Sequence, residues 1–154
     1  MKKSICICLL FLLLAAALVN AQDHTAAQRL LIERFYQEVY IKGDTGVIKA
    51  LVAETYVDHN QARWPNRDGI ARIVHLLHVR LPDLTVTVDE WYFRADHVVV
   101  QATFSGTLDG YPMRWVTMDA YRVEDGKLAE AWHLPLADKA GLPPLNSRSS
   151  GVRL

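Results

Sequence analysis

The spacing of apolar residues changes at Pro82, and this change constrains the fold more than any other feature of the sequence. Before Pro82, apolar residues recur every three or four positions, which is the period of an amphipathic helix. After Pro82 they alternate with polar residues, as in a strand with one buried face. The sequence therefore predicts an α+β fold, in which helices cover one face of a mostly antiparallel sheet.

Three helices are predicted before this change. The first spans residues 25–41. The second begins at Asp44, a residue type that caps helices well, and runs to Val52. The third begins near residues 66–68 and ends before Pro82, because the residue before a proline disfavours the helical conformation.

Four strands are predicted in the second half of the chain. They cover residues 84–89, 97–105, 113–123 and 127–136. Turn dipeptides separate these four strands at Ala95-Asp96, Asp109-Gly110 and Asp125-Gly126. Asp-Gly between alternating segments is typical of tight hairpins, so the sequence predicts a meander of neighbouring strands.

The last hairpin carries an ionisable residue at each end, Asp119 and His133. Along its first strand, Asp119 alternates with Arg114 and Arg122, which mark the wetter face. Asp119 is therefore expected on the apolar side, where burial raises the pKa of a carboxyl that has no partners. Such a carboxyl can act as a general base or as a hydrogen-bond donor at neutral pH. The alternative is a solvated Asp119, or one paired with an arginine.

The length of the turn decides whether His133 shares the face of Asp119. If the turn has two residues, Asp119 lies opposite Trp132 and His133 points away. If the turn has three residues, 124–126, with a glycine bulge, Asp119 lies opposite Ala131 and shares its face with His133.

The three-residue turn is favoured, because it leaves Glu130 near Arg122 on the wet face. It also turns Leu128 and Trp132 outward, where a partner subunit or an overlying segment would have to bury them. The favoured turn therefore places both ionisable groups of the hairpin on the inner side of the sheet.

A second polar cluster, Tyr56, His59 and Asn60, follows the second predicted helix and precedes Trp64. These residue types suit a small pocket that orients an oxygen-bearing ligand. The alternative is a loop whose side chains bind nearby backbone groups.

The sequence shows no motif for a metal or a cofactor. His75 and His78 are spaced by three on the third predicted helix, but no third ligand with zinc spacing accompanies them. They are expected to be surface residues. The sequence contains no glycine-rich phosphate loop, serine nucleophile elbow or cysteine nucleophile. We therefore expect no metal and no cofactor.

The N-terminus has the pattern of a secretory signal peptide, because Lys2 and Lys3 precede an apolar run over residues 5–19. The prediction is a signal peptide over residues 1–21, cleaved before Gln22. The alternative is an uncleaved anchor, but ~15 apolar residues fall short of the ~20 that a spanning helix needs. A periplasmic or secreted protein is expected.

The remaining chain is predicted to form one domain over residues 22–140 with a flexible C-terminal tail over residues 141–154. Cys6 and Cys8 both lie in the predicted signal peptide, so the domain has no cysteine for a disulfide. No basic patch suggests a nucleic-acid partner or, after cleavage of the signal peptide, a membrane partner. A small hydrophobic or carbonyl-bearing ligand is expected instead.

Several segments of the chain resemble the SnoaL-like polyketide cyclases of the NTF2-like superfamily. They are YVDHN at 56–60, RDGI at 67–70, LPDLTVTVDE at 81–90, FSGT at 104–107 and MDAYRVEDGKLAEAW at 118–132. The resemblance runs from about Ala27 to Leu142. It implies a cone-shaped barrel in which three N-terminal helices pack on a curved, mostly antiparallel sheet. It also implies a cavity between them, a homodimer formed through the sheet, and no cofactor.

The resemblance also implies roles for individual residues. In the related ketosteroid isomerases, a tyrosine and a protonated aspartate bind an oxyanion, and these positions fall on Tyr36 and Asp119. The position of the isomerase base falls on Asn60, whose amide cannot take a proton. In the cyclases, an inward aspartate is the acid/base in an intramolecular aldol closure. This role falls on Asp119, with His133 as its proton partner and with Asn60, His59 and Tyr36 orienting the substrate.

The sequence and the resemblance together predict an exported, cofactor-independent acid/base catalyst of the cyclase or isomerase type. Its expected substrate is a small carbonyl compound. The expected catalytic residues are Asp119, His133 and Asn60, and the expected substrate-binding residues are Tyr36, Tyr56, His59, Trp64, Thr117 and Tyr121. The alternative is a non-catalytic, periplasmic small-molecule binding module of the NTF2-like superfamily.

Overall fold

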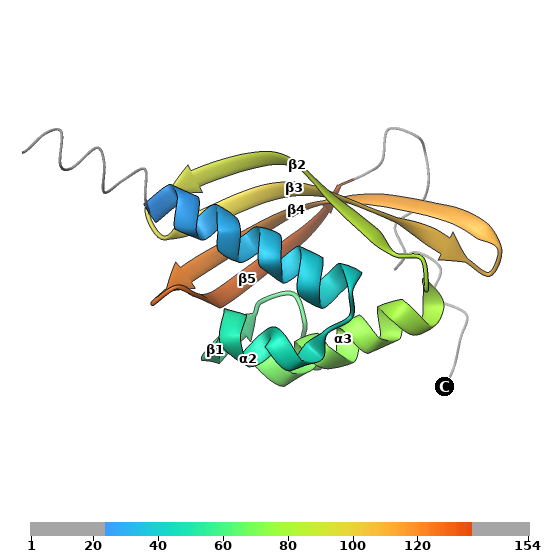
Figure 1. Ribbon diagram of the computed structural model, residues 1–154, viewed down its shortest axis with the longest axis horizontal. Helices are drawn as coiled ribbons and strands as arrows, with labels where there is room; N and C mark the ends of the chain where they lie inside the picture. Colours follow the sequence, from blue (N-terminus) through green and yellow to red (C-terminus); the bar gives the residue numbers. More distant parts are fainter. Residues whose placement is uncertain (1–23, 137–154) are drawn as a thin grey trace, which may run out of the picture.

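Five strands form one curved sheet, and the helices pack against one of its faces (Figure 1). This structure, a computed structural model, describes residues 24–136, so the predicted signal peptide and the predicted C-terminal tail lie outside the described residues. A helix over residues 24–34 continues directly into the next element. The elements that follow are η1 (Phe35–Ile41), η2 (Thr45–Val47), α2 (Ile48–Leu51), β1 (Val52–Asp58), α3 (Arg67–Arg80), β2 (Thr85–Arg94), β3 (His97–Leu108), β4 (Tyr111–Glu124) and β5 (Lys127–Leu136).

The strand order in the sheet is β1-β5-β4-β3-β2. The four C-terminal strands form an antiparallel meander, whereas β1 pairs with β5 in parallel. The predicted α+β fold, with N-terminal helices on a mostly antiparallel sheet, is confirmed.

The C-terminal half of the first predicted helix is a π-helix, η1, rather than a continuous α-helix. Its wider turn is visible where the N–H of Lys42 donates to the carbonyl of Gln37, five residues earlier. The wider turn lets η1 present Phe35, Tyr36 and Val39 as buried residues. This local geometry could not be predicted from the apolar period, because η1 has only seven residues, which is too short for the pattern to distinguish the two helix types.

The predicted second helix was too long at its C-terminal end. A 3₁₀ turn, η2, and a single α-helical turn, α2, end at Leu51, and Val52 begins β1. The segment after Leu51 is rich in β-branched and aromatic residues, which favour a strand. It becomes a strand by pairing with β5, for example Asp58 with Ala131, and this partner is distant in the sequence.

The third predicted helix is confirmed as α3. The side chain of Asn66 accepts a hydrogen bond from the N–H of Gly69 and caps the N-terminus. Gly69 has no space for a larger side chain, because a Cβ atom there would lie 2.1 Å from the carbonyl oxygen of Trp64. The loop before α3 therefore packs directly against the first turn of the helix.

The predicted turn dipeptides are confirmed as two-residue turns. Residues at the first turn position adopt positive φ angles, which are 52° at Ala95, 52° at Asp109 and 50° at Asp125. Gly110 and Gly126 follow at 84° and 71°. In the turns at Asp109-Gly110 and Asp125-Gly126, both central residues have positive φ, which is the type I′ geometry and matches the twist of antiparallel strands.

The β4–β5 turn is therefore shorter than the favoured prediction. Glu124 pairs with Lys127, and Val123 pairs with Leu128. Ala129 is then an extra residue, a β-bulge that shifts the register of the rest of β5.

Because of this bulge, Asp119 lies opposite His133, rather than opposite Trp132 or Ala131 as the two alternatives predicted. The favoured prediction was nevertheless right that Asp119 and His133 share the inner face. The prediction that Leu128 turns outward was wrong, since the two-residue turn pairs Leu128 with Val123 and Leu128 is fully buried. Trp132 does lie on the outer face, where it is half-buried.

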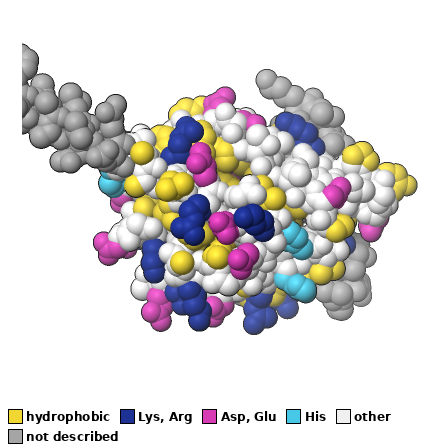
Figure 2. Space-filling model, viewed as in Figure 1, with side chains coloured by type: hydrophobic (Ala, Val, Ile, Leu, Met, Phe, Trp, Pro, Cys, Tyr) yellow, Lys and Arg dark blue, Asp and Glu magenta, His cyan; other side chains and the backbone are white. Residues whose placement is uncertain are grey.

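The core lies between the helices and the inner face of the sheet, where aromatic rings from η1, β3 and β4 meet. The surface seen from the helix side carries basic and acidic side chains interspersed with hydrophobic ones (Figure 2). Within residues 24–136, no helix is long and apolar enough to cross a membrane.

Candidate active site

Asp119 is almost fully buried, with 1% of its surface exposed, and it accepts hydrogen bonds on both carboxyl oxygens. The hydroxyls of Tyr36 and Thr117 donate to Oδ2, at 2.5 and 2.9 Å. Nδ1 of His133 lies 3.0 Å from Oδ1. Alternation along β4 places Thr117, Asp119 and Tyr121 on the same inner face. Asp119 is therefore a buried carboxyl with three partners, and not the partnerless carboxyl that was considered from the sequence.

His133 lies between two carboxyl groups. Its Nδ1 contacts Asp119, and its Nε2 lies 3.4 Å from Oδ2 of Asp58. Burial alone would lower the pKa of His133, but the hydrogen bond to Asp119 and the ion pair with Asp58 raise this pKa to about 9. At neutral pH, His133 is therefore an imidazolium ion.

Asp58 was not among the predicted site residues. It ends β1, where it is buried, and its N–H donates to the carbonyl of Pro65 at 2.7 Å. Burial would raise its pKa, but the ion pair with His133 and hydrogen bonds from the backbone of Asn60 and Gln61 lower it below the usual value. The sequence signal was available, since Tyr56 and Asp58 alternate with exposed residues, but it becomes visible only when β1 is recognised as a strand.

Asn60 reaches the site through the backbone. Its side-chain oxygen accepts a hydrogen bond from the N–H of His133 at 2.6 Å. Its own N–H donates to Oδ1 of Asp58 at 2.9 Å. Asn60 therefore links the end of β1 to β5 and positions both His133 and Asp58.

Two tyrosines complete the network around Asp119. The hydroxyls of Tyr36 and Tyr121 lie 2.9 Å apart. Burial, followed by the charge of Asp119, raises the pKa of Tyr36 well above its usual value. Burial also raises the pKa of Tyr121. Both phenols therefore stay neutral and can donate hydrogen bonds throughout the physiological pH range.

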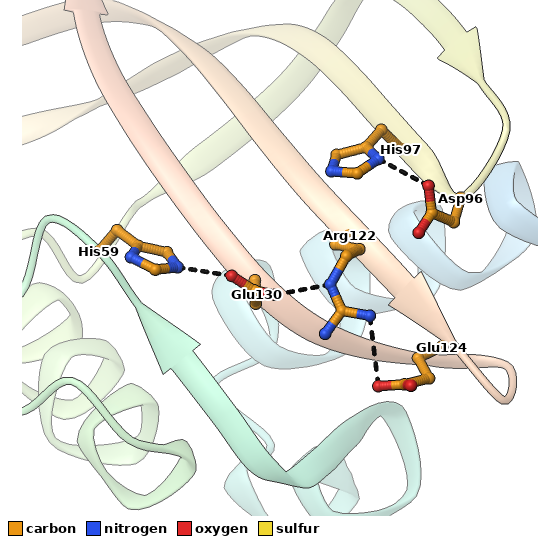
Figure 3. Close-up of polar contacts among 6 residues, drawn as sticks. All are labelled: His59, Asp96, His97, Arg122, Glu124 and Glu130. Atoms are coloured by element: carbon orange, nitrogen blue, oxygen red, sulfur yellow. Dashed lines mark hydrogen bonds and ion pairs between the residues drawn. The ribbon is translucent and has the colours of Figure 1, made fainter.

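His59 does not belong to this site, although the sequence placed it there. It lies on the outer side of the sheet, where its ring stacks on Trp132 with the ring centroids 4.4 Å apart. Its Nε2 lies 2.7 Å from Oε2 of Glu130, and the other carboxyl oxygen of Glu130, Oε1, accepts a hydrogen bond from Nε of Arg122 (Figure 3). Alternation past Asp58 turns His59 away from the inner face.

Trp64 is also separate from the site. It borders a hollow of about 310 Å³ against α3, together with residues such as Leu77 and Leu81. The guanidinium of Arg63 lies 4.8 Å from the centre of one of its rings. Trp64 thus packs against α3, and the predicted pocket of Tyr56, His59, Asn60 and Trp64 is divided among three places.

The two histidines of α3 differ in environment. His75 is exposed, as predicted, but His78 is half-buried because its Nε2 contacts the carbonyl oxygen of Tyr40 at 2.8 Å. Within residues 24–136, no group of three or more histidine, cysteine or acidic side chains is arranged to hold a metal ion.

The sequence profile of the SnoaL-like polyketide cyclase family matches residues 30–143. This match covers all of the site described above. No curated protein sequence matches the chain.

Solved structures show the same fold. A candidate polyketide cyclase from Bacillus cereus is similar with a TM-score of 0.64 at 24% identity, over 68% of this chain and 71% of that chain. TsrD from Streptomyces laurentii is similar with a TM-score of 0.63 at 25% identity, over 75% and 91%. An LEH-like epoxide hydrolase from M. tuberculosis shares the fold, with a TM-score of 0.60 at 15% identity over 73% of this chain and 84% of that chain.

These neighbours confirm the NTF2-like cone fold that the resemblance implied. The fold brings together Tyr36, Asn60, Thr117, Asp119, Tyr121 and His133, adds Asp58, and excludes His59 and Trp64. From the extent of the profile match, the chain belongs to the SnoaL-like polyketide cyclase family.

Proposed function

We propose that the protein is a cofactor-independent acid/base catalyst that enolises a small carbonyl compound, for cyclisation or isomerisation. One observation carries this proposal. The imidazolium of His133 is held between the carboxylates of Asp119 and Asp58 on the inner face of the sheet. The pKa of the imidazolium is raised and that of the Asp58 carboxyl is lowered, so at neutral pH a protonated acid lies next to an ionised base, and this pairing supports proton abstraction next to a carbonyl.

The two contacts of His133 suggest which atoms react. Nδ1 is 3.0 Å from Asp119, but the 3.4 Å between Nε2 and Asp58 exceeds the usual hydrogen-bond distance of about 2.7–3.2 Å. The proton on Nε2 is therefore the one available to a substrate carbonyl. Asp119 acts through His133, because its oxygens are already occupied and its charge keeps the imidazole protonated.

The proposed step is a balanced enolisation. Oδ2 of Asp58 takes a proton from the carbon next to the substrate carbonyl, and the electron pair of that C–H bond forms a C=C bond. The π-electrons of the carbonyl take the proton from Nε2 of His133. The product is an enol, with a protonated Asp58 and a neutral His133.

The enol can then react in two ways. In an intramolecular aldol closure, its carbon attacks a second carbonyl of the same molecule while its O–H proton returns to His133. Asp58 then protonates the new alkoxide. In an isomerisation, Asp58 returns its proton to a different carbon of the conjugated enol, while the enol O–H proton returns to His133 and the carbonyl is restored. Membership of a cyclase family supports the first outcome.

The proposal includes export and self-association. Export is proposed from the signal-like sequence of residues 1–21. A homodimer through the outer face of the sheet is proposed from its exposed apolar side chains, such as Tyr92 and Leu134, which are 52% and 61% exposed.

Exchange of α-protons tests the enolisation without knowledge of the natural substrate. The protein is incubated in D₂O with a panel of small ketones and diketones, and deuterium incorporation is followed by NMR. We expect exchange with the wild type and a loss of about 10²-fold or more in Asp58→Asn and His133→Gln. His75→Gln, an exposed histidine on α3, is the control. Equal exchange in all these proteins, or none with any compound, would contradict the proposal.

A binding module is the second candidate, and the complete hydrogen bonding of Asp119 by protein donors favours it. In that case a ligand bound from cell extract stays chemically unchanged. Mass spectrometry of the ligand before and after prolonged incubation distinguishes the two functions.

A further inference from the structure

The end of β1 that carries Asp58 is joined to the sheet by an irregular pairing. β1 lies at the edge of the sheet and pairs with β5. The register of this pairing is interrupted after Val52 and resumes only at Val57 and Asp58. One further backbone hydrogen bond follows, from the N–H of His59 to the carbonyl of Ala131 at 2.9 Å. Side chains are therefore expected to contribute to the position of Asp58 relative to β5.

Three side chains on the outer face of the sheet connect β1 to β5 at this point, and we call His59, Glu130 and Trp132 the outer cluster. The ring of His59 lies flat on Trp132, with the ring planes 4° apart and the centroids 4.4 Å apart. Nε2 of His59 lies 2.7 Å from Oε2 of Glu130. These two contacts fix the plane of the imidazole and its place along β5.

Glu130 is itself held from the next strand. Its Oε1 accepts a hydrogen bond from Nε of Arg122 at 2.6 Å, and Arg122 on β4 also contacts Glu124 at 3.3 Å. Figure 3 shows this row of charged groups, which crosses from β4 over β5 to His59. The outer cluster therefore anchors the end of β1 to the middle strand of the sheet.

Two members of the outer cluster are sequence neighbours of the ion pair on the inner face. His59 follows Asp58, and Trp132 precedes His133. Successive side chains point to opposite faces, and their Cα atoms are about 3.8 Å apart across a rigid peptide. A shift of His59 relative to Trp132 would therefore change the separation of Asp58 and His133.

This separation, 3.4 Å between Nε2 of His133 and Oδ2 of Asp58, has little tolerance. A shorter contact would bind the Nε2 proton to Asp58 in a hydrogen bond and withhold it from a substrate. A longer contact would weaken the attraction that keeps His133 protonated. In an active site, a misplacement of about 1 Å can cost about 10²-fold in rate.

We infer that the outer cluster is a positioning device, which sets the separation of Asp58 and His133 from the opposite face of the sheet. Its members are positioning residues, because they act through the ion pair and from the face that the substrate does not reach. The role in catalysis rests on the proposed function, whereas the effect of the cluster on His133 can be measured without any substrate.

NMR titration of the histidine side chains tests the inference. The signal of His133 is identified by its absence from His133→Gln, and the pKa of His133 is measured in the wild type, in His59→Ala and in Trp132→Leu. Loss of either ring should let Asp58 move away from His133. We therefore expect the pKa of His133 to fall by about one pH unit or more, and the rate of α-proton exchange to fall about tenfold.

The direction of the shift excludes a simple charge effect. Loss of a basic side chain by itself can only raise the pKa of a neighbouring imidazolium. A lower pKa of His133 in His59→Ala therefore reports a change of geometry.

His97→Ala is the matched control. Nδ1 of His97 also lies 2.7 Å from a carboxylate oxygen, that of Asp96, and its ring lies 6.3 Å from Trp132. However, His97 begins β3, which β4 and β5 separate from β1. This variant should leave both the pKa of His133 and the exchange rate unchanged.

Circular dichroism verifies that each variant is folded, and Trp132→Leu decides the test if His59→Ala does not fold. The inference is overturned if the pKa of His133 stays at or above the wild-type value in the folded cluster variants, or if His97→Ala lowers it equally. A lowered pKa in the cluster variants without exchange in the wild type would leave the positioning role standing and refute the catalysis. Exchange in the wild type with an unchanged pKa in the cluster variants would do the reverse.

Discussion

The side-chain oxygen of Asn60 accepts a hydrogen bond from the backbone N–H of His133, at 2.6 Å. The two residues lie just beyond the last pair of β1 and β5, which is Asp58 with Ala131. Asn60 thus extends the pairing of these strands with a side chain where the backbone ladder has ended. The amide oxygen of Asn60 thus accepts the His133 N–H in place of the backbone carbonyl of a further paired residue.

Asn60→Ala is expected to lower the rate of α-proton exchange about tenfold, because His133 loses its backbone anchor. The free energy of unfolding should fall by only about 1 kcal/mol, as for one hydrogen bond. Asn66→Ala is a matched control, since Asn66 also accepts from a backbone N–H but at the start of α3. It should lose similar stability and keep the full rate, as measured by urea unfolding and NMR. An equal loss of rate in both variants would mean that Asn60 contributes only stability.

The rate of exchange should depend on pH through His133. The pKa of this imidazolium is about 9, so the acid form is present at neutral pH and is lost above pH 9. The pKa of Asp58 is lowered, so its basic form persists well into the acidic range. We expect kcat/KM to be flat through neutral pH and to fall as pH rises through about 9. A rate that instead rises above pH 9 would identify neutral His133 as a base.

The same group makes folding stability depend on pH. The pKa of His133 is about 9 in the folded state and near 6.5 in the unfolded state, so the folded state binds the proton more tightly. This contribution, on the order of 3 kcal/mol, is fully present below about pH 6.5 and is lost as pH rises through about 9. The difference in unfolding free energy between the wild type and His133→Gln should therefore shrink across this range. A constant difference would show that the imidazolium adds no stability.

Asp119→Asn is expected to fold and to lose about 10² to 10⁴ in exchange rate. An amide retains one acceptor for Tyr36 and Thr117 but removes the charge that keeps His133 protonated. The alkaline limb of the pH profile should therefore move to lower pH. This shift separates a role through His133 from simple damage to the fold, which would lower the rate without moving the limb.

Gly69→Ala should destabilise the protein by a few kcal/mol, because the new Cβ would lie 2.1 Å from the carbonyl oxygen of Trp64. Backbone atoms cannot rotate away from this clash. Ala71→Gly, two residues later on α3, is the matched control and should cost only about 1 kcal/mol through helix propensity. Thermal unfolding of both variants measures the difference. Similar losses would show that the loop before α3 moves easily.

The sequence was most informative where local chemistry determines the structure. The turn residues Asp109-Gly110 and Asp125-Gly126 require positive φ angles, and both lie in the predicted turns. The start of α3 was also predicted near Asn66, whose side chain caps the helix locally. These elements depend on a few adjacent residues and not on distant partners.

The sequence was least informative where a distant partner determines the structure. The strand β1 exists because β5 pairs with it, and Asp58 was missed together with that strand. The inward direction of His133 was predicted from a three-residue turn, whereas a two-residue turn and a bulge at Ala129 produce it. Both routes shift the register of β5 by one residue, in opposite directions, so the predicted face was right although the predicted pairs were wrong.

Ala129 has a methyl group and no reactive atom, yet it sets the orientation of the acid. Without it, every later side chain of β5 would rotate by half a turn, and the imidazole would face the outer surface. One extra residue in the turn after Glu124 would also shift the register by one and turn the later side chains of β5 back to their present faces. An insertion there should therefore rescue a deletion at Ala129. Relatives can therefore differ in both places and still present the same chemistry, provided that the two changes occur together.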